Sequence, residues 1–358
     1  MIIAVVLLFS ACMKDEELWM QTETGISDAG TGVFVVNEGN FMYGNGSLSY
    51  YDFETKEVEN DLFFKVNELP LGDVPLSMTV HGGLGYVVVN NSGKIIVLDP
   101  ETAAFKGKIT GLTSPRHLHF LNDTKAYVTD LYARSVAIVN PGTFEVSGSV
   151  DVSNDESRFN RHSTDQMLQY GKYVFTNCWS YDNQILVIDS EKDVVVDSIR
   201  VLKQPTAMVL DRFNKLWVLT DGGFPGSPYG HEAPGLIRIN AVTREVERII
   251  RFSEGDHPAD LKMNGTRDTL YMINRHLYRM PVFSGEDPQV FVESPYEGTN
   301  AGGFYGLGVD PFTSDIYLAD AIDHVQRGVV YRYRSDGSPS DTFRVGISPV
   351  DFCFWAIQ

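Results

Sequence analysis

Residues 127–130 read Tyr-Val-Thr-Asp, and six other stretches repeat the same pattern, a run of β-branched and aromatic residues that ends in Asn or Asp. The polar residues that end the seven runs are Asn37, Asn90, Asp130, Asn177, Asp221, Asn274 and Asp320. They follow one another at intervals of about 47 residues, which indicates a repeated supersecondary unit. A second apolar run comes after most of them and ends in turn-forming residues, as at Asp99-Pro100 and Asn140-Pro141.

These runs are apolar on both faces instead of alternating, as expected of sheets that pack between other sheets. A repeat of about 47 residues is the size of one propeller blade. A β-sandwich has fewer strands, and a parallel β-helix would need shorter repeats. The sequence therefore predicts an all-β fold, a seven-bladed β-propeller with four antiparallel strands per blade, over residues 32–358.

A strand that begins with proline opens most of the repeats, at Pro75, Pro115, Pro205 and Pro258. The same element occurs again at residues 349–354, next to the end of the chain, and no such element precedes the first run. We therefore expect the C-terminal strand to be the innermost strand of the first blade. This pairing would remove an open sheet edge, which otherwise invites aggregation.

The N-terminal residues predict the cellular location of the protein and are not part of the predicted propeller. The apolar run at residues 2–11 is shorter than the roughly 20 residues of a membrane-spanning helix and is typical of a secretory signal. It ends in Phe-Ser-Ala before Cys12, which resembles the cleavage box of bacterial lipoproteins, and the following Lys-Asp-Glu-Glu resembles the surface-export signal of Bacteroidetes lipoproteins. The sequence thus predicts a signal peptide at 1–11, a lipidated Cys12 with a polar tether over 12–31, and a lipid-anchored protein at the outer surface of the outer membrane.

Charge and motifs exclude several classes of function. The 358 residues carry 29 Lys and Arg against 47 Asp and Glu, a net charge of −18, so we expect no nucleic-acid partner. The chain has no Gly-rich phosphate loop, nucleophile elbow or His-Glu-x-x-His run, and we expect a protein that is not an enzyme. Cys178 and Cys353 are interpreted as small buried residues, because neither has a second cysteine at the spacing of a zinc site.

We also expect no bound metal or cofactor, with one alternative kept open. Five carboxylates offer oxygen ligands for a Ca²⁺ ion on the axis, as lactonase-type propellers use. These residues are Glu38, Asp130, Asp221, Asp260 and Asp320. They form no dedicated acidic cluster in the sequence.

The lengths of the predicted loops indicate where a ligand binds. If the strands of a blade are lettered a to d from the axis outward, the b–c and d–a loops lie on one face of the ring, which we call the loop face. The a–b turns on the other face are brief, whereas the loop face receives long segments rich in aromatic residues, such as 177–184 and 221–235. Long loops on a rigid scaffold commonly carry function. The predicted ligand-binding residues are Asn37, Asn40, Phe41, Asn90, Tyr132, Arg161, Asn177, Trp179, Tyr181, Asp221, Tyr229, Asn274 and Arg275. About half of the seven strand-end Asn and Asp residues are expected to have only a structural role as turn caps.

Two resemblances narrow the function. The Tyr-Val-Thr-Asp blades resemble the Tyr-Val-Thr-Asn repeats of bacterial surface-layer propellers. The segment Asn37-Glu38-Gly39-Asn40-Phe41, followed by residues 46–52, resembles the BtuG-type surface propellers of gut Bacteroidetes, which capture vitamin B12. This second resemblance implies a corrinoid bound on the propeller face and its delivery to a TonB-dependent outer-membrane transporter. A structural or adhesive surface-layer propeller and a lactonase-like enzyme are the alternatives.

Overall fold

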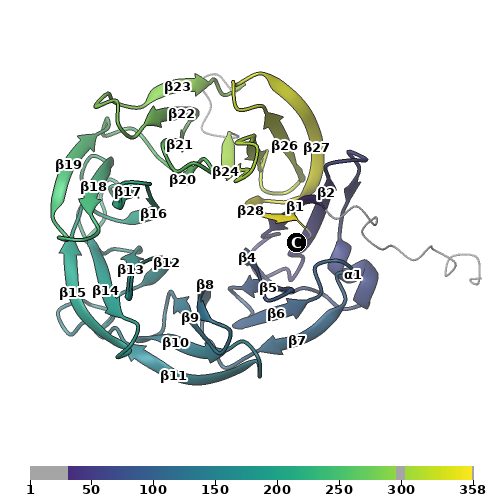
Figure 1. Cartoon of the computed structure of the whole chain (residues 1–358), viewed down its shortest axis with the longest axis horizontal. Coiled ribbons are helices and arrows are strands. Elements are labelled where there is room, and N and C mark those ends of the chain that lie inside the picture. The colour runs from purple at the N-terminus through teal and green to yellow at the C-terminus, as the bar shows by residue number, and fades with distance from the viewer. Residues whose placement is uncertain (1–30, 296–302, 357–358) are drawn as a thin grey trace, which may run out of the picture.

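Seven four-stranded antiparallel sheets stand around a central axis, and the chain visits them in order around the ring (Figure 1). The structure, a computed structural model, describes residues 31–295 and 303–356. The predicted propeller with seven blades of four strands is confirmed. The predicted signal peptide, Cys12 and the predicted tether up to residue 30 lie outside the described residues.

Each blade is one such sheet, in which four strands follow one another from the axis outward. Blades 1 to 3 are β28 (Pro349–Ala356), β1 (Thr31–Asn37), β2 (Ser47–Asp52) and β3 (Val58–Glu59); β4 (Pro75–His81), β5 (Leu84–Val89), β6 (Lys94–Leu98) and β7 (Phe105–Ile109); and β8 (Pro115–Asn122), β9 (Lys125–Asp130), β10 (Ser135–Asn140) and β11 (Glu145–Asp151). Blades 4 and 5 are β12 (Thr164–Tyr170), β13 (Tyr173–Cys178), β14 (Gln184–Asp189) and β15 (Val194–Arg200); and β16 (Pro205–Leu210), β17 (Lys215–Thr220), β18 (Gly235–Asn240) and β19 (Val246–Arg251). Blades 6 and 7 are β20 (Asp260–Met263), β21 (Thr269–Asn274), β22 (His276–Pro281) and β23 (Gln289–Val292); and β24 (Phe304–Val309), β25 (Ile316–Asp320), β26 (Arg327–Tyr333) and β27 (Pro339–Ile347).

Both faces of the b strands are buried because each blade packs against two neighbours. In β1, Val33 belongs to the same apolar cluster as Tyr317 of blade 7, whereas the next residue, Phe34, belongs to the same cluster as Met78 of blade 2. Successive side chains of a strand point to opposite faces, so one strand serves two inter-blade cores. This explains why the repeats read as continuous apolar runs.

The ring closes as predicted, by antiparallel pairing of β1 with β28. The pairing runs from Thr31 opposite Ala356 to Asn37 opposite Pro349. Trp355 of β28 lies with its ring centroid 6.2 Å from that of Phe34 and 6.4 Å from that of Tyr50. The last strand therefore contributes a large side chain to the core of the first blade as well as its backbone hydrogen bonds.

The connection between blades 1 and 2 contains the helix α1 (Leu62–Asn67), which buries Leu62 and Phe63 in the core between these blades. Within the described residues, no helix is long and apolar enough to cross a lipid bilayer.

Replacing Trp355 with Ala should lower the free energy of unfolding by about 3–5 kcal/mol, because the substitution leaves a cavity beside Phe34 and Tyr50. Urea denaturation followed by tryptophan fluorescence and circular dichroism measures the loss. Phe312→Ala is the control, since Phe312 is 76% exposed and should change stability by no more than about 0.5 kcal/mol. Equal stabilities of the two variants would show that the closing strand adds little to the ring.

Candidate functional site

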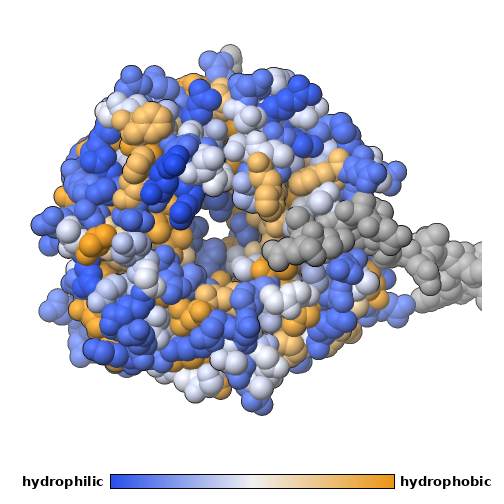
Figure 2. Space-filling model, in the orientation of Figure 1, coloured by the Kyte–Doolittle hydropathy of each residue, from blue (hydrophilic) through white to orange (hydrophobic). Residues whose placement is uncertain are grey.

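A cavity of about 360 Å³ lies on the propeller axis at the loop face, and the ring is open at its centre (Figure 2). Its wall takes one residue from the start of each blade's innermost strand or the position just before it. These residues are Leu76, Arg116, Asp165, Thr206, Ala259, Tyr305 and Val350. In five blades the residue directly follows a proline, whose fixed φ favours the same entry into the strand each time. The repeat thus places seven successive side chains around one point, where they determine the chemistry of what we call the axial cavity.

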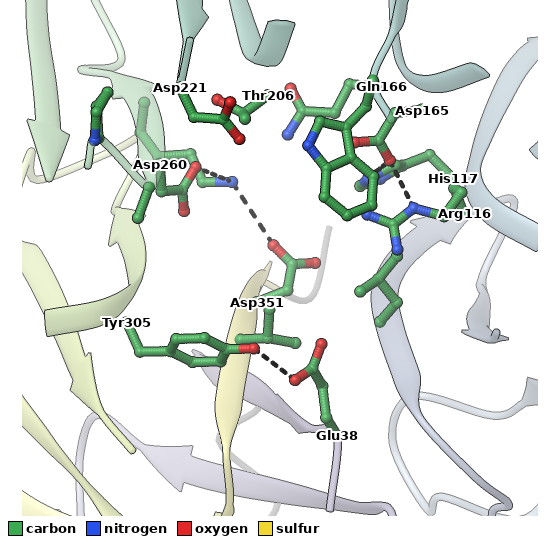
Figure 3. Close-up of a pocket in the computed structure, with 16 residues that line it drawn as sticks. Glu38, Arg116, His117, Asp165, Gln166, Thr206, Asp221, Asp260, Tyr305 and Asp351 are labelled. Carbon is green, nitrogen blue, oxygen red and sulfur yellow. Dashed lines mark hydrogen bonds and ion pairs between the residues drawn. The ribbon is translucent and has the colours of Figure 1, made fainter. Parts of the chain in front are cut away.

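One side of the axial cavity is built on an ion pair. Arg116 Nε donates to Asp165 Oδ1 at 2.8 Å, and Nε2 of His117 lies 3.4 Å from the same oxygen (Figure 3). Burial alone would raise the pKa of the Asp165 carboxyl, but the adjacent Arg116 and His117 lower it below its usual range. The guanidinium of Arg116 also stacks over Trp179, 5.1 Å from the ring centroid. The pair therefore stays charged at neutral pH and holds the indole of Trp179 against the wall.

The opposite side holds two more groups of ionisable residues. Tyr305 donates its hydroxyl to Glu38 Oε2 at 2.6 Å (Figure 3). Burial raises the pKa of Glu38, and the hydrogen bond from Tyr305 offsets this only in part. Lys262 lies 3.6 Å from an oxygen of Asp260 and 3.7 Å from one of Asp351. Burial likewise raises the pKa of Asp260 in spite of the nearby Lys262.

The cavity wall carries more carboxyl groups than cationic side chains. Glu38, Asp165, Asp221, Asp260 and Asp351 line it, against the two permanent cations of Arg116 and Lys262. The ring of Trp179 lines the cavity, whereas its Nε1 is buried away from the cavity and has no hydrogen-bond partner among the described residues. The carboxylates are suited to N–H and O–H groups of a ligand.

Beside the cavity mouth, the loops of blades 3, 4 and 5 bring aromatic rings together. The ring of Tyr181 lies 5.8 Å from that of Phe159 and 4.3 Å from that of Tyr229, measured between centroids. The guanidinium carbon of Arg161 lies 5.2 Å from the ring centroid of Phe159 and 5.3 Å from that of Tyr132. These residues and Arg158, which donates to the Tyr229 hydroxyl, form one surface that we call the aromatic patch. Gln204 joins it to the cavity, because its amide accepts from the Tyr181 backbone N–H and donates to Asp221.

The structure therefore divides the predicted site residues into groups. Tyr132, Arg161, Tyr181 and Tyr229 belong to the aromatic patch, and Trp179 and Asp221 line the axial cavity. Six of the thirteen predicted residues thus lie in two adjoining parts of the loop face.

Four predicted residues have their side chains engaged with the framework. Asn37 donates to the carbonyl oxygens of Val35 and Ser47, and Asn90 donates to that of Pro115. Asn177 donates to the carbonyl oxygen of Pro205, and Asn274 accepts from the backbone N–H of His257. The amides of Asn90, Asn177 and Asn274 hold the end of a b strand to the beginning of an a strand or the residues just before it, and that of Asn37 holds β1 to β2. The structural role expected for some of the strand-end residues is therefore observed.

The remaining three predicted residues lie in connections after b strands. Phe41 is 66% exposed in the loop that follows β1. The side chain of Asn40 bonds within this loop, to Asn45, and reaches the carbonyl oxygen of His324. Arg275 is exposed in the tight connection between β21 and β22. None of the three lines the axial cavity.

Sequence reasoning did not place Arg116, Asp165, Tyr305, Lys262 or Asp351 in the site. Their signal was present in the repeat, since Arg116 follows the proline that opens its strand and Asp165 and Tyr305 hold the equivalent position in blades without that proline. The side chains at this position are also more polar than those of the neighbouring b strands.

The carboxylates proposed as ligands of an axial Ca²⁺ ion do not all meet. Glu38, Asp221 and Asp260 line the axial cavity, whereas Asp130 accepts backbone N–H groups of its own turn and Asp320 caps Ile322. Among residues 31–295 and 303–356, one group of three side chains comes close enough to hold a metal ion, and it contains none of these five residues.

Comparisons with known proteins give a family and a fold. The family described as "Domain of unknown function (DUF5074)" matches residues 31–343, so the chain belongs to this family. No curated protein matches it.

Among solved structures, a quinonprotein alcohol dehydrogenase-like protein from Bacteroides thetaiotaomicron is 14% identical, with 91% of this chain and 78% of that chain covered and a TM-score of 0.67. The periplasmic gluconolactonase of Pseudomonas aeruginosa is 12% identical, with 91% and 99% covered and a TM-score of 0.66. Hydrazine synthase of Kuenenia stuttgartiensis is 15% identical, with 78% and 89% covered and a TM-score of 0.62. At such identities the likeness extends to the propeller fold alone, and the different names of these proteins show how many functions one fold carries.

Replacing Arg116 with Met should lower the free energy of unfolding by about 3–5 kcal/mol, because it leaves the buried Asp165 carboxylate without its cation. The double variant Arg116→Met with Asp165→Asn should recover most of this loss. Chemical denaturation of the three proteins at pH 7 provides the comparison. A double variant no more stable than the single one would contradict the assignment of the loss to an unpaired charge.

Because the pKa of Glu38 is raised, the effect of Glu38→Gln on the melting temperature should depend on pH. A carboxyl whose pKa is higher in the folded state opposes folding when it is ionised, and this cost disappears as the pH falls through the folded pKa. The Gln variant should therefore gain melting temperature relative to wild type at pH 7, and the gain should shrink on acidification towards pH 4. Thermal melts at half-unit intervals test this, and a gain that stays constant with pH would contradict it.

Proposed function

We propose that this member of the DUF5074 family is a non-catalytic ligand-capture protein that binds a corrinoid on the loop face, over the axial cavity. The observation that carries the proposal is the direct connection of a hydrogen-bonding cavity with an aromatic surface. Trp179 lines the cavity, and Tyr181, two residues further along the same loop, belongs to the aromatic patch. Such a combination of apolar surface and a few convergent polar groups is typical of small-molecule sites.

The chemistry of a corrinoid matches both parts. Its macrocycle has broad apolar faces, and aromatic rings are suited to contact them. Its rim carries primary amides, which donate hydrogen bonds through N–H groups and accept them through carbonyl oxygens. The carboxylates of Glu38, Asp221 and Asp351 would accept from the amides.

Size decides where the macrocycle would lie. A cavity of about 360 Å³ is much too small for a whole corrinoid, so the ring would rest over the mouth and amide arms would reach inward. The patch contains two guanidinium groups, Arg158 and Arg161, which are suited to the phosphate of a complete cobalamin. A ligand held on an open face is also accessible to a second protein.

We further propose that the captured corrinoid passes to a TonB-dependent transporter of the outer membrane. The support comes from the sequence: the predicted lipoprotein signal, and the resemblance of residues 37–52 to the BtuG-type propellers. The loop face would then face the transporter, with the lipid on Cys12 as the anchor.

Isothermal titration with cyanocobalamin and with cobinamide tests the capture. We expect binding of one equivalent of either ligand, and a higher melting temperature in its presence. Cobinamide lacks the nucleotide arm, so tighter binding of cyanocobalamin would indicate that Arg158 and Arg161 contact the phosphate. Absence of heat and of thermal stabilisation with both ligands would overturn the proposal.

Variants on the two parts of the site test where the corrinoid binds. Tyr181→Ala should weaken binding about 30-fold or more if the ring is an anchor, corresponding to about 2 kcal/mol. Trp179→Phe keeps an aromatic ring but removes the N–H and part of the ring area, so a smaller loss is expected. Phe213→Ala is the matched control, an exposed aromatic residue in an a–b turn on the opposite face. Equal affinities of Tyr181→Ala and Phe213→Ala would place the ligand elsewhere.

Assays of lactone hydrolysis and of adhesion with the same protein distinguish the alternative functions. Hydrolysis of a sugar lactone that depends on the axial residues would make the protein an enzyme. A folded chain that neither binds corrinoids nor turns over lactones, but adheres to a surface, would support the structural role.

A further inference from the structure

A second cluster of polar side chains lies outside the lining of the axial cavity, and it contains three different kinds of metal ligand. A ring nitrogen of His162, the sulfur of Cys178 and a carboxylate oxygen of Asp182 all lie within 4.8 Å of one another. They come from the d–a loop before β12, the end of β13 and the loop between β13 and β14. Spacing along the chain does not reveal the group, because the fold brings residue 162 to residues 178 and 182.

We propose that His162, Cys178 and Asp182 bind one divalent transition-metal ion of the zinc type. Imidazole nitrogen, thiolate sulfur and carboxylate oxygen are the three ligand types that Zn²⁺ takes in proteins. With bonds of about 2.0–2.3 Å, tetrahedral ligand atoms lie about 3.3–3.8 Å apart. Nδ1 of His162 lies 2.6 Å from Oδ2 of Asp182, so this hydrogen-bonded pair would have to open, while any ligand atoms as far apart as 4.8 Å would have to approach by about 1 Å. Cys178 is fixed on a strand, whereas His162 and Asp182 are carried by loops that can supply this movement.

Charge and burial support a doubly charged ion at this place. Cys178 is fully buried, and the side chains of His162 and Asp182 are each only 14% exposed. A neutral imidazole, a thiolate and a carboxylate balance the two positive charges of the ion, so the loaded site is electrically neutral and inexpensive to bury. Binding would release the thiol proton of Cys178 to solvent, together with the proton that His162 shares with Asp182 if the imidazole is protonated.

One of the three side chains reaches a cleft that is open to solvent. His162 also lines a cleft of about 360 Å³ on the outer side of blades 3 and 4, together with Val152, Leu186 and Asp197. Of the three ligands, His162 alone lines this cleft, so an ion would have to enter past its imidazole, and a water molecule would complete the tetrahedron. Three protein ligands and an exchangeable fourth position are the pattern of open zinc sites.

A bound ion would stabilise the conformation of the proposed corrinoid site without contacting the corrinoid. Between Cys178 and Asp182 lie Trp179, on the cavity wall, and Tyr181, in the aromatic patch. Fixing both ends of this segment would hold the indole and the phenol in place. The metal proposal itself does not depend on the identity of the ligand, and its test uses the metal alone.

Isothermal titration of chelator-treated, tag-free protein with Zn²⁺ measures the site. We expect one equivalent per chain and a rise in melting temperature. His162→Gln and Cys178→Ser should each weaken binding at least ~10-fold, since even the partners behind metal ligands contribute about 10–100-fold. His81→Gln is the matched control, because His81 also pairs with an aspartate, Asp123, at 3.1 Å but has no cysteine in such a group.

Cobalt provides a readout that a merely structural His–Asp pair would not give. Co²⁺ in the wild-type protein should show a thiolate charge-transfer band in the near ultraviolet, and Cys178→Ser should lack it. If Cys178→Ser does not fold, the Zn²⁺ affinity of His162→Gln and the cobalt spectrum of the wild-type protein test the proposal instead. Absence of stoichiometric Zn²⁺ binding, a cobalt complex without the thiolate band, or equal binding by His162→Gln and His81→Gln would overturn the proposal.

Discussion

The pairing of β28 with β1 is the constraint on which the whole ring depends. Seven blades enclose a central space only when the first and last are joined, and the two ends of the propeller meet in a single sheet. The closed ring fixes the positions of the seven innermost strands relative to one another. Because those positions are fixed, the first residues of these strands can converge on a cavity, and charged groups can be held there in defined pairs.

Most of the fold was predictable from sequence, because each blade repeats the same physical requirement. Every b strand packs on two neighbours, which makes it apolar on both faces, and its end must be tied to the adjacent a strand, which favours Asn or Asp. The same logic explains why the site was predicted less well. Asn37 and Asn177 are prominent in the sequence because the framework needs them, and their amide N–H groups donate to backbone oxygens. Repetition marks the framework, whereas a ligand site consists of the positions at which the blades differ.

The position after the strand-opening proline shows this difference clearly. It holds an arginine in blade 3, a threonine in blade 5 and a valine in blade 1, although the backbone there is nearly equivalent. No rule of strand formation requires such variety. The partnership of Arg116 with Asp165 joins residues 49 positions apart, and only the curvature of the ring brings them to 2.8 Å. Local pattern therefore predicts where such side chains point but not which of them meet.

Buried ion pairs are a weak source of stability, since desolvation cancels much of their attraction. An axis lined by Arg116 with Asp165, and by Lys262 with two carboxylates, is thus poorly explained as a device for holding the ring together. An apolar plug would close the same space at lower cost. The charges are better understood as preorganised groups whose partners are already fixed before a ligand arrives, so that binding does not require them to reorient.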